Sequence, residues 1–273
     1  MEQVIDLLPL ALTMLATGVV AGVMAGLLGV GGGIVIVPVL DTALGIQGVD
    51  PSIRMHVAVA TSLATIIPTS ISSARAHHAK GAVDFSLVKF WSPFILVGSL
   101  LGTVLATRVD SSVLSLVFGG VALLVAIKMM IPTEGVHLSN GVKRGPAGAT
   151  VPFAIGGLSS MMGIGGGTLS VPTLTLMKQP IHSAVGSSAM FGLVIAVPGT
   201  LSFMISGWGD PRLPEGSLGF VNAIGFIFIA PTTVLFAPLG AKIAHGLNKR
   251  TLSLVFGVFL LVVSIRMLLR TLG

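Results

Sequence analysis

Two copies of one glycine run constrain this chain more than any other feature of its sequence. The first copy, Gly-Val-Gly-Gly-Gly, occupies residues 29–33, and the second, Gly-Ile-Gly-Gly-Gly, occupies residues 163–167. In each copy a proline follows five residues after the last glycine, and the surrounding sequence is apolar and uncharged. Glycine in a helix interior costs about 1 kcal/mol relative to alanine. A helix that enters either run is therefore predicted to break there.

The composition is that of an integral membrane protein. Hydrophobic residues make up 53% of the 273 residues and charged residues only 9%, against about 25% charged residues in soluble domains, and the mean hydropathy is +1.02. Several uncharged runs reach the roughly 20 residues that a membrane-spanning helix needs. We therefore expect an all-α integral membrane protein with a single transmembrane domain. Its apolar segments are 7–44, 56–74, 85–107, 111–131, 147–177, 182–206, 217–244 and 250–270.

The same composition excludes several functional classes. The chain has no cysteine, which rules out disulfides and thiolate metal sites. Its net charge of +6 is an excess that membrane topology produces, so no nucleic-acid partner is expected. We find no nucleophile and base pair and no metal-ligand spacing such as HExxH. We therefore expect no enzymatic activity, no cofactor and no metal.

Internal matches indicate that the chain is a duplication. The glycine runs are 134 residues apart, the stretch 56–62 matches 182–188 at a separation of 126, and the stretch 114–119 is identical to 252–257 at a separation of 138. Three matches in the same order are the mark of an internal repeat. The predicted units are a first repeat at 1–131, a cytoplasmic linker at 132–146 and a second repeat at 147–273.

The distribution of lysine and arginine predicts how the repeats are oriented. Segment 7–44 would be about 57 Å long as one helix, nearly twice the roughly 30 Å hydrocarbon core, so it either re-enters as a hairpin or crosses twice. If it and segment 147–177 both return to the side on which they began, one side collects most of the basic residues. These are Arg75, Lys80, Lys89, Lys128, Lys143, Arg144, Lys178, Lys242, Lys249 and Arg250. Because such residues favour the cytoplasmic side, we expect two inverted repeats in the bacterial cytoplasmic (inner) membrane, with the N-terminus outside.

The glycine runs are predicted to build an anion site. A short helix beginning after each run would point its free N–H groups and its positive dipole end into the break. The predicted substrate-binding glycines are Gly31, Gly32, Gly33, Gly165, Gly166 and Gly167. The alternative is helix packing, which the GxxxG pairs Gly22 with Gly26 and Gly98 with Gly102 exemplify. A dinucleotide-binding motif is disfavoured because its last glycine is replaced by Ile34 and by Thr168.

Hydroxyl side chains at predicted membrane depth supply further donors for an oxyanion. Thr168 and Ser170 follow the second glycine run. The repeat alignment adds Thr61, Ser62, Ser187 and Ser188 as predicted substrate-binding residues. The alternative for each is that it satisfies its own helix backbone or joins two helices. No carboxylate lies deep in a segment apart from Asp41 near the end of the first, which favours anions over cations.

Histidines and tryptophans mark the predicted helix ends. His56 and His182 begin equivalent segments and are candidates for gating or proton-linked roles, with interfacial helix-start residues as the alternative. His77 and His78 beside Arg75 and Lys80 are interpreted as a cytoplasmic surface cluster, and Lys242 with His245 could attract an anion toward the pore. Trp91 and Trp208 fall near predicted membrane edges, where tryptophan often anchors a helix.

The duplicated Gly-x-Gly-Gly-Gly run, each followed by an apolar stretch and a proline, resembles the motif of the sulfite exporter TauE/SafE family of bacterial membrane permeases. The resemblance covers essentially the whole chain. It implies transport of sulfur-containing anions such as sulfite, sulfoacetate or other organosulfonates through the cytoplasmic membrane. The glycine runs 29–33 and 163–167 are the positions carried over from that family.

These observations predict a secondary transporter, with export favoured, that moves a small sulfur-containing oxyanion by alternating access. The partners expected are this small anionic substrate and the lipid bilayer, and a homodimer is left open. An anion channel and a non-transporting membrane enzyme or assembly subunit are the alternatives. Inverted repeats with discontinuous helices and a site between them are a recurrent transporter architecture.

Overall fold

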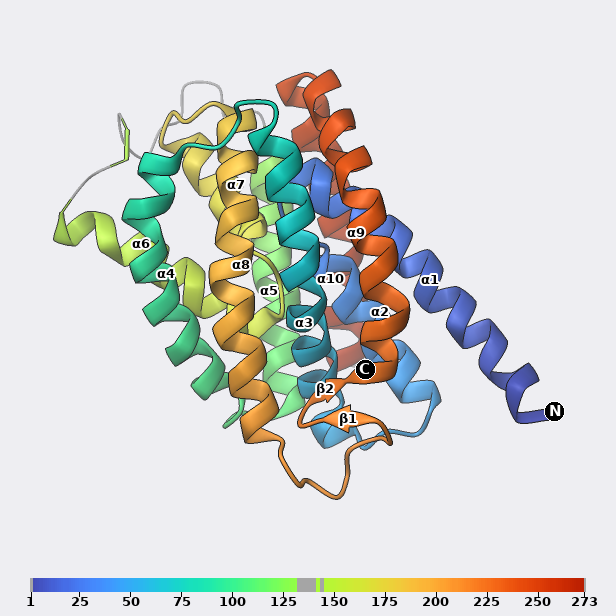
Figure 1. Cartoon of the computed structure of the whole chain (residues 1–273). Coiled ribbons are helices and arrows are strands. Elements are labelled where there is room, and N and C mark those ends of the chain that lie inside the picture. The colour runs from blue at the N-terminus through green and yellow to red at the C-terminus, as the bar shows by residue number, and fades with distance from the viewer. Residues whose placement is uncertain (1, 132–140, 143–144, 273) are drawn as a thin grey trace.

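The computed structural model describes residues 2–131, 141–142 and 145–272, and these residues form a bundle of helices (Figure 1). The first part contains α1 (Glu2–Leu28), α2 (Gly33–Ile46), α3 (Pro51–His78), α4 (Phe85–Ala106) and α5 (Ser111–Met130). The second contains α6 (Pro146–Met162), α7 (Gly167–Leu176), α8 (Ile181–Ser206), α9 (Ala223–Gly246) and α10 (Lys249–Leu272). A two-stranded hairpin, β1 (Ser217–Leu218) and β2 (Val221–Asn222), precedes α9. The predicted linker 132–146 lies mostly outside the described residues.

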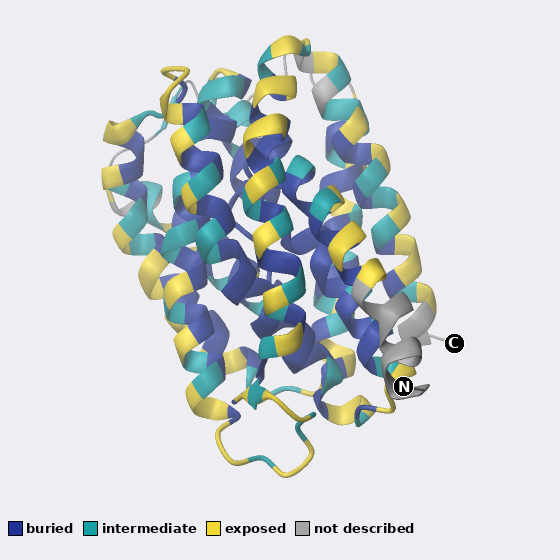
Figure 2. Cartoon of the chain, turned by 45° about the vertical axis from the view of Figure 1, so that its right-hand side comes forward, coloured by how far each residue is buried: buried dark blue, intermediate teal, exposed yellow. Residues whose placement is uncertain are grey.

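The helices confirm the all-α membrane class. Five of them, α3, α4, α5, α8 and α9, are long and apolar enough to span a bilayer. Their outer faces carry exposed large apolar side chains such as Leu124, Ile205 and Leu235, while buried residues run through the middle of the bundle (Figure 2). Exposed apolar faces on helices of this length are what a lipid environment requires. The chain is therefore a multi-pass membrane protein.

The predicted helix breaks occur at both glycine runs. In the first run Gly29, Gly31 and Gly32 have positive φ angles of 66°, 72° and 82°, and in the second Gly163 has a φ of 65°. Side chains with a Cβ rarely adopt this backbone conformation. Gly32, the N-cap residue of α2, lies against α1, where a Cβ would be 2.8 Å from the carbonyl oxygen of Ala21, and α2 then packs along α1. The first segment is thus a hairpin whose two ends lie in the lower part of Figure 1.

Two antiparallel helices, α3 and α8, form the centre of the bundle. Gly199 of α8 lies against the side chain of Leu63, and Gly192 lies against the hydroxyl of Ser70, about two turns later on α3. The other helices pack around this pair, with α1 against α9, α6 against α4, and α5 against α10. The other helices therefore surround α3 and α8, the two helices with the most buried hydroxyl side chains.

Equivalent glycines of the two halves make the same contact with the roles exchanged. In the α5 and α10 pair, Gly119 packs on Leu268 and Gly257 packs on Met130. Gly119 and Gly257 are equivalent at a separation of 138, and so are Met130 and Leu268. One contact is therefore made twice, once from each half.

Equivalent glycines also make equivalent contacts in two other helix pairs, α1 with α9 and α6 with α4. Gly22 of α1 packs on the backbone of Thr233 of α9, and Gly156 of α6 packs on the backbone of Ile95 of α4. Glycine lets the backbones of membrane helices approach closely. The GxxxG pairs singled out in the sequence thus pack helix on helix, as the packing alternative states.

One of the two tryptophan anchors predicted from the sequence is wrong. Trp91 is only 1% exposed and stacks on Phe191 of α8, with ring centroids 5.6 Å apart. It lies on the inner face of α4, where helix packing rather than the membrane interface surrounds it. Trp208, in contrast, is 72% exposed just beyond the end of α8.

The end of the bundle near the β-hairpin is closed by polar caps. Asp50 accepts hydrogen bonds from the backbone N–H and the hydroxyl of Ser52, and these bonds lower the pKa of its carboxyl group. Arg212 pairs with Asp210 and donates to the hydroxyl of Ser52 at 3.0 Å, which ties the loop between α8 and α9 to the start of α3. Bonds to Arg212 likewise lower the pKa of Asp210.

The close approach of α4 and α6 predicts a position-specific sensitivity. A Cβ on Gly102 would lie 2.6 Å from the Cα of Gly157, whereas a Cβ on Gly120 would meet no atom within 4 Å. We expect Gly102→Ala to destabilise the protein by about 1–3 kcal/mol, as overpacking does. The control Gly120→Ala should be neutral or slightly stabilising because alanine favours the helix. Thermal unfolding of the purified protein in detergent measures both, and equal melting temperatures would contradict the packing described.

Candidate functional site at the two helix breaks

The two helix breaks meet in the interior of the molecule, backbone against backbone. Gly33 lies against the carbonyl oxygen of Gly163, and Gly167, its equivalent, lies against the carbonyl oxygen of Gly29. Gly165 lies against the carbonyl oxygen of Val30. None of these three positions leaves room for a Cβ, so only glycine permits the contact.

The remaining predicted glycines hold the breaks against their neighbours. Gly31 packs on Ile66 of α3, Gly32 on the last turns of α1, and Gly166 on Phe191 and Gly192 of α8. All six predicted glycines therefore lie at the junction of the two halves.

Each short helix offers free N–H groups at this junction. The first backbone bonds of α2 run from Val35 and Ile36 to the carbonyl of Gly32, and the first bond of α7 runs from Ser170 to the carbonyl of Gly166. No side chain caps either helix start. Within the described part of the chain, the N–H groups of Gly33, Ile34, Gly167, Thr168 and Leu169 therefore donate to no acceptor. Such donors at the positive end of a helix dipole are suited to an anion.

Three of the predicted hydroxyls already have structural partners. Thr61 accepts from the backbone N–H of Asn222 at 2.9 Å, which fixes the start of α9. Ser62 donates to the carbonyl of Gly163 at 2.7 Å, and Ser187 accepts from the backbone N–H of Asp84 at 3.0 Å. In this conformation these three hydroxyls hold neighbouring elements together.

The other three predicted hydroxyls are buried and have no partner. Thr168 and Ser170 on α7 and Ser188 on α8 are all 0% exposed, and no protein atom hydrogen-bonds to their oxygens. An unpaired buried hydroxyl costs about 1–3 kcal/mol. Native proteins rarely leave such groups unpaired, so each of these three hydroxyls is a candidate donor to a polar ligand.

Sequence reasoning missed Ser70, which belongs to the same region. Its hydroxyl is buried and unpaired, and it lies against Gly192 of α8, which in turn lies against Gly166 at the start of α7. The signal was available, because Ser70 follows Ser62 by eight residues and so shares its helix face. Ser159 and Thr200 are likewise buried and unpaired.

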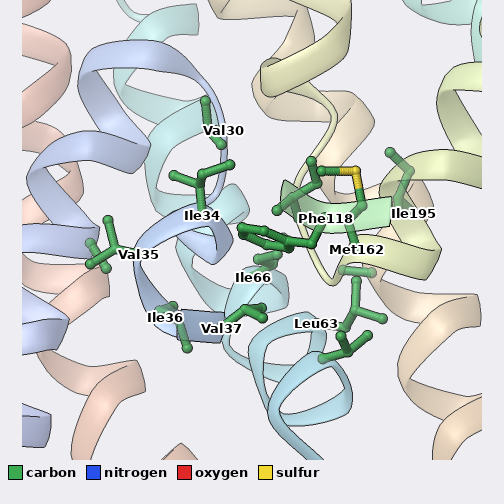
Figure 3. Close-up of a cluster of buried hydrophobic side chains, with 14 of the residues drawn as sticks. Val30, Ile34, Val35, Ile36, Val37, Leu63, Ile66, Phe118, Met162 and Ile195 are labelled. Carbon is green, nitrogen blue, oxygen red and sulfur yellow. The ribbon is translucent and has the colours of Figure 1, made fainter. Parts of the chain in front are cut away.

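The two halves are polar to different degrees at their breaks. Where α7 carries Thr168 and Ser170, α2 carries Ile34 and Ile36, and these pack with Leu63 in an apolar cluster (Figure 3). Phe118 of α5 reaches the same cluster. The first turn of α7 thus carries unpaired buried hydroxyls, whereas the equivalent positions of α2 carry apolar side chains.

Cations lie toward the opposite, C-terminal ends of the short helices. Lys128 donates to the carbonyl of Pro172 at 2.9 Å and to the hydroxyl of Thr175 at 3.2 Å, and Arg266, its equivalent, donates to Thr42 at 2.7 Å. Positive charge is favourable at the negative end of a helix dipole. Asp41, the only buried carboxylate among the described residues, lies 3.3 Å from Arg54.

The two predicted gating histidines have different surroundings. His56 contacts the carbonyls of Ala106 and Val109 at 3.1 and 3.0 Å, so it joins the start of α3 to the end of α4. His182 stacks on His245 of α9, with ring centroids 5.2 Å apart. Among the described residues, no three His, Cys, Asp or Glu side chains have the geometry of a metal site.

The fold and the junction define a multi-pass helical membrane protein. In it the two short helices that follow the breaks, α2 and α7, begin next to each other. The chain belongs to the sulfite exporter TauE/SafE family, whose model matches residues 14–267. It is 36% identical to a "Probable membrane transporter protein" of Haemophilus influenzae over 94% of this chain and 97% of the relative. It is 26% identical to the "Probable membrane transporter protein YunE" of Bacillus subtilis over 92% and 94% of the two chains. A Methanocaldococcus jannaschii protein, also named a probable membrane transporter, is 26% identical over 96% of both chains. No solved structure matches the chain.

The equivalent serines Ser62 and Ser188 predict opposite effects of one substitution. Ser62→Ala removes the donor to the buried carbonyl of Gly163 and should cost about 1–3 kcal/mol. Ser188→Ala removes a hydroxyl that has no partner, so it should be neutral or stabilising in the absence of ligand. Unfolding in detergent compares the two variants, and a destabilising Ser188→Ala would show that its hydroxyl bonds within the protein.

Proposed function

We propose that this protein is a secondary transporter that carries a small sulfur-containing oxyanion, such as sulfite or an organosulfonate, across the bacterial cytoplasmic membrane. Membership of the TauE/SafE family and the names of the relatives support transport. The observation that carries the substrate class is the presence of unpaired buried hydroxyls, Thr168 and Ser170 in the first turn of α7 and Ser188 on α8, together with the free N–H groups of α7. Oxyanions accept hydrogen bonds and donate few, which matches a site made of donors.

The proposed site recognises charge without a charged side chain. Free N–H groups and the dipole of α7 favour an anion, and hydroxyls donate to its oxygens. Asp41, the single buried carboxylate in the described ranges, is paired with Arg54 and lies toward the opposite end of α2 from the glycine run. Hydroxyls reorient freely, which suits the common S–O geometry of sulfite and sulfonates.

We further propose that the two halves are inverted repeats that expose the site alternately to the two sides. The exchanged contacts of equivalent glycines and the antiparallel packing of α3 on α8 support this arrangement. Because the glycine runs touch backbone to backbone, an anion enters between them only if α2 and α7 separate. Moving α7 with α8 away from α2 and α3 would open the polar second break first.

Export is the favoured direction on electrical grounds. When a divalent anion leaves a negative-inside cell, its electrical free energy falls by about 2.3 kcal/mol per charge for each 100 mV of membrane potential. Export of such an anion therefore needs no carboxylate site for a coupling cation.

The membrane orientation can be tested directly because the chain has no cysteine. Glu215 lies in the loop before α9, and Lys80 lies just after α3, at the opposite end of the bundle. Cysteine at 215 should react with a membrane-impermeant maleimide in intact cells, and cysteine at 80 only after permeabilisation, because basic residues favour the cytoplasm. The reverse labelling would invert the proposed topology, and equal labelling of both would exclude it.

The substrate site is tested by a pair of isosteric substitutions on one helix. Thr168→Val removes an unpaired buried hydroxyl at the site, whereas Thr173→Val removes a hydroxyl that bonds only its own helix at Leu169. Loss of one hydrogen bond to a charged ligand costs about 1.5–3 kcal/mol, so Thr168→Val should reduce sulfite or sulfoacetate flux about tenfold or more. Thr173→Val should retain flux.

Both variants should be reconstituted into vesicles at equal protein content. Saturable flux with counterflow in the unsubstituted protein is expected of a carrier, and its absence would favour the channel alternative. Full flux through Thr168→Val would exclude this hydroxyl from the site. No flux of any sulfur oxyanion through the unsubstituted protein would overturn the proposed function itself.

A further inference from the structure

Three histidines from three different helices meet at one end of the bundle. His77 of α3 and His245 of α9 approach with their Nδ1 and Nε2 atoms 3.3 Å apart, and His182 of α8 stacks on His245 at an interplanar angle of 18°. His77 is buried, whereas His182 and His245 are half-buried. The sequence interpretation of His77 as a surface residue is therefore wrong, because α1 and α9 cover it.

The hydrogen bonds fix where the protons of this histidine cluster lie when it is neutral. The carbonyl of Gly26 can only accept, so Nε2 of His77, 2.7 Å away, carries a proton. Neutral His77 then has an acceptor at Nδ1, and His245 donates to it through Nε2. A proton added to Nδ1 of His77 keeps this bond only if neutral His245 carries its own proton on Nδ1 and accepts through Nε2.

The cluster is linked directly to the first glycine run. Gly26 lies in the last turn of α1, where carbonyls lack a helical partner, and Ser73 donates to the neighbouring carbonyl of Ala25 at 3.3 Å. His77 therefore caps the helix end three residues before the break at Gly29. A change in the protonation of the histidines would therefore affect the break through the hydrogen bond from His77 to Gly26.

The titratable groups that interact electrostatically with His77 and His245 are all basic. Electrostatic repulsion from His182 disfavours a proton on both His77 and His245, and repulsion from Lys80, just beyond α3, disfavours a proton on His245. No described carboxylate acts on either residue, and none lies in the last turn of α1. Lys242 lies one turn before His245 on α9, and His78 packs edge-on against Phe85 outside the cluster. Within the described part of the chain, a proton taken up by His77 or His245 would therefore lack a negative partner.

We propose that His77, His182 and His245 form a second, proton-linked oxyanion site, in which an anion binds together with a proton. The anion supplies the negative charge that the cluster lacks, and the added proton supplies a further donor to it. Each ligand then strengthens binding of the other by the same factor. This inference goes beyond the site at the helix breaks and rests on the proposed function only for the class of anion.

Proton uptake on anion binding tests the proposal. Sulfate, thiosulfate and sulfoacetate do not titrate near neutral pH, so a proton taken up with them must come onto the protein. We expect the purified full-length protein in detergent to take up close to one proton per anion at pH values where the anion-free histidines are neutral. Over that range, each decrease of one pH unit should strengthen anion binding about tenfold. Titration calorimetry in two buffers of different ionisation enthalpy measures the uptake.

Variants assign the proton to the cluster. His182→Gln and His245→Gln change half-buried residues and should lose both the uptake and the pH dependence. His78→Gln, outside the cluster, should keep both. His77→Gln is less suitable because it also removes the cap on α1. Absence of proton uptake with all three anions, or unchanged uptake in both cluster variants, would overturn the proposal.

Flux measurements keep this inference separate from the proposed function. Saturable flux without anion-linked proton uptake would overturn the histidine site alone. Proton uptake that is lost in the cluster variants, but with no flux of any sulfur oxyanion, would overturn the transport function and leave the histidine site standing.

Discussion

The backbone contact between the two glycine runs is the constraint on which the rest of the structure depends. Gly33, Gly165 and Gly167 each lie against a carbonyl oxygen of the opposite run, where a Cβ would not fit. Backbone that leaves a helix inside a membrane must be covered by protein or used by a ligand. The central pair α3 and α8 covers it from both sides, and the outer helices then cover α3 and α8.

Asymmetry within this near-symmetric frame gives the junction its chemistry. Ser62 and Ser188 are equivalent, yet one donates to Gly163 and the other has no partner. The second short helix begins with hydroxyls and the first with isoleucines. The fold thus places two helix starts together, and hydroxyl side chains follow only the second of them. The histidine cluster follows the same rule, because His182 joins it whereas its equivalent His56 caps the end of α4.

Much of this could be predicted from the sequence, and the errors have a common cause. The helix breaks, the membrane class and the glycine positions followed from composition and local propensity. Trp91 and His77 were misplaced because position along a segment gives depth but not which face is covered, and both side chains point into the bundle. Ser70 was overlooked although it shares a face with Ser62. Whether Thr61 faces a ligand or Asn222 depended on the loop before α9, which no local pattern describes.

The sequence by itself determined that this chain is a helical membrane protein in which helices break at two glycine runs. These properties follow from hydropathy, segment length and glycine propensity, which act over a few consecutive residues. Only the tertiary structure decided that the two breaks touch, which hydroxyls remain unpaired, and that three histidines separated by up to 168 residues in the chain meet. Those outcomes depend on how helices pack across the bundle, where contacts join residues that are distant in sequence.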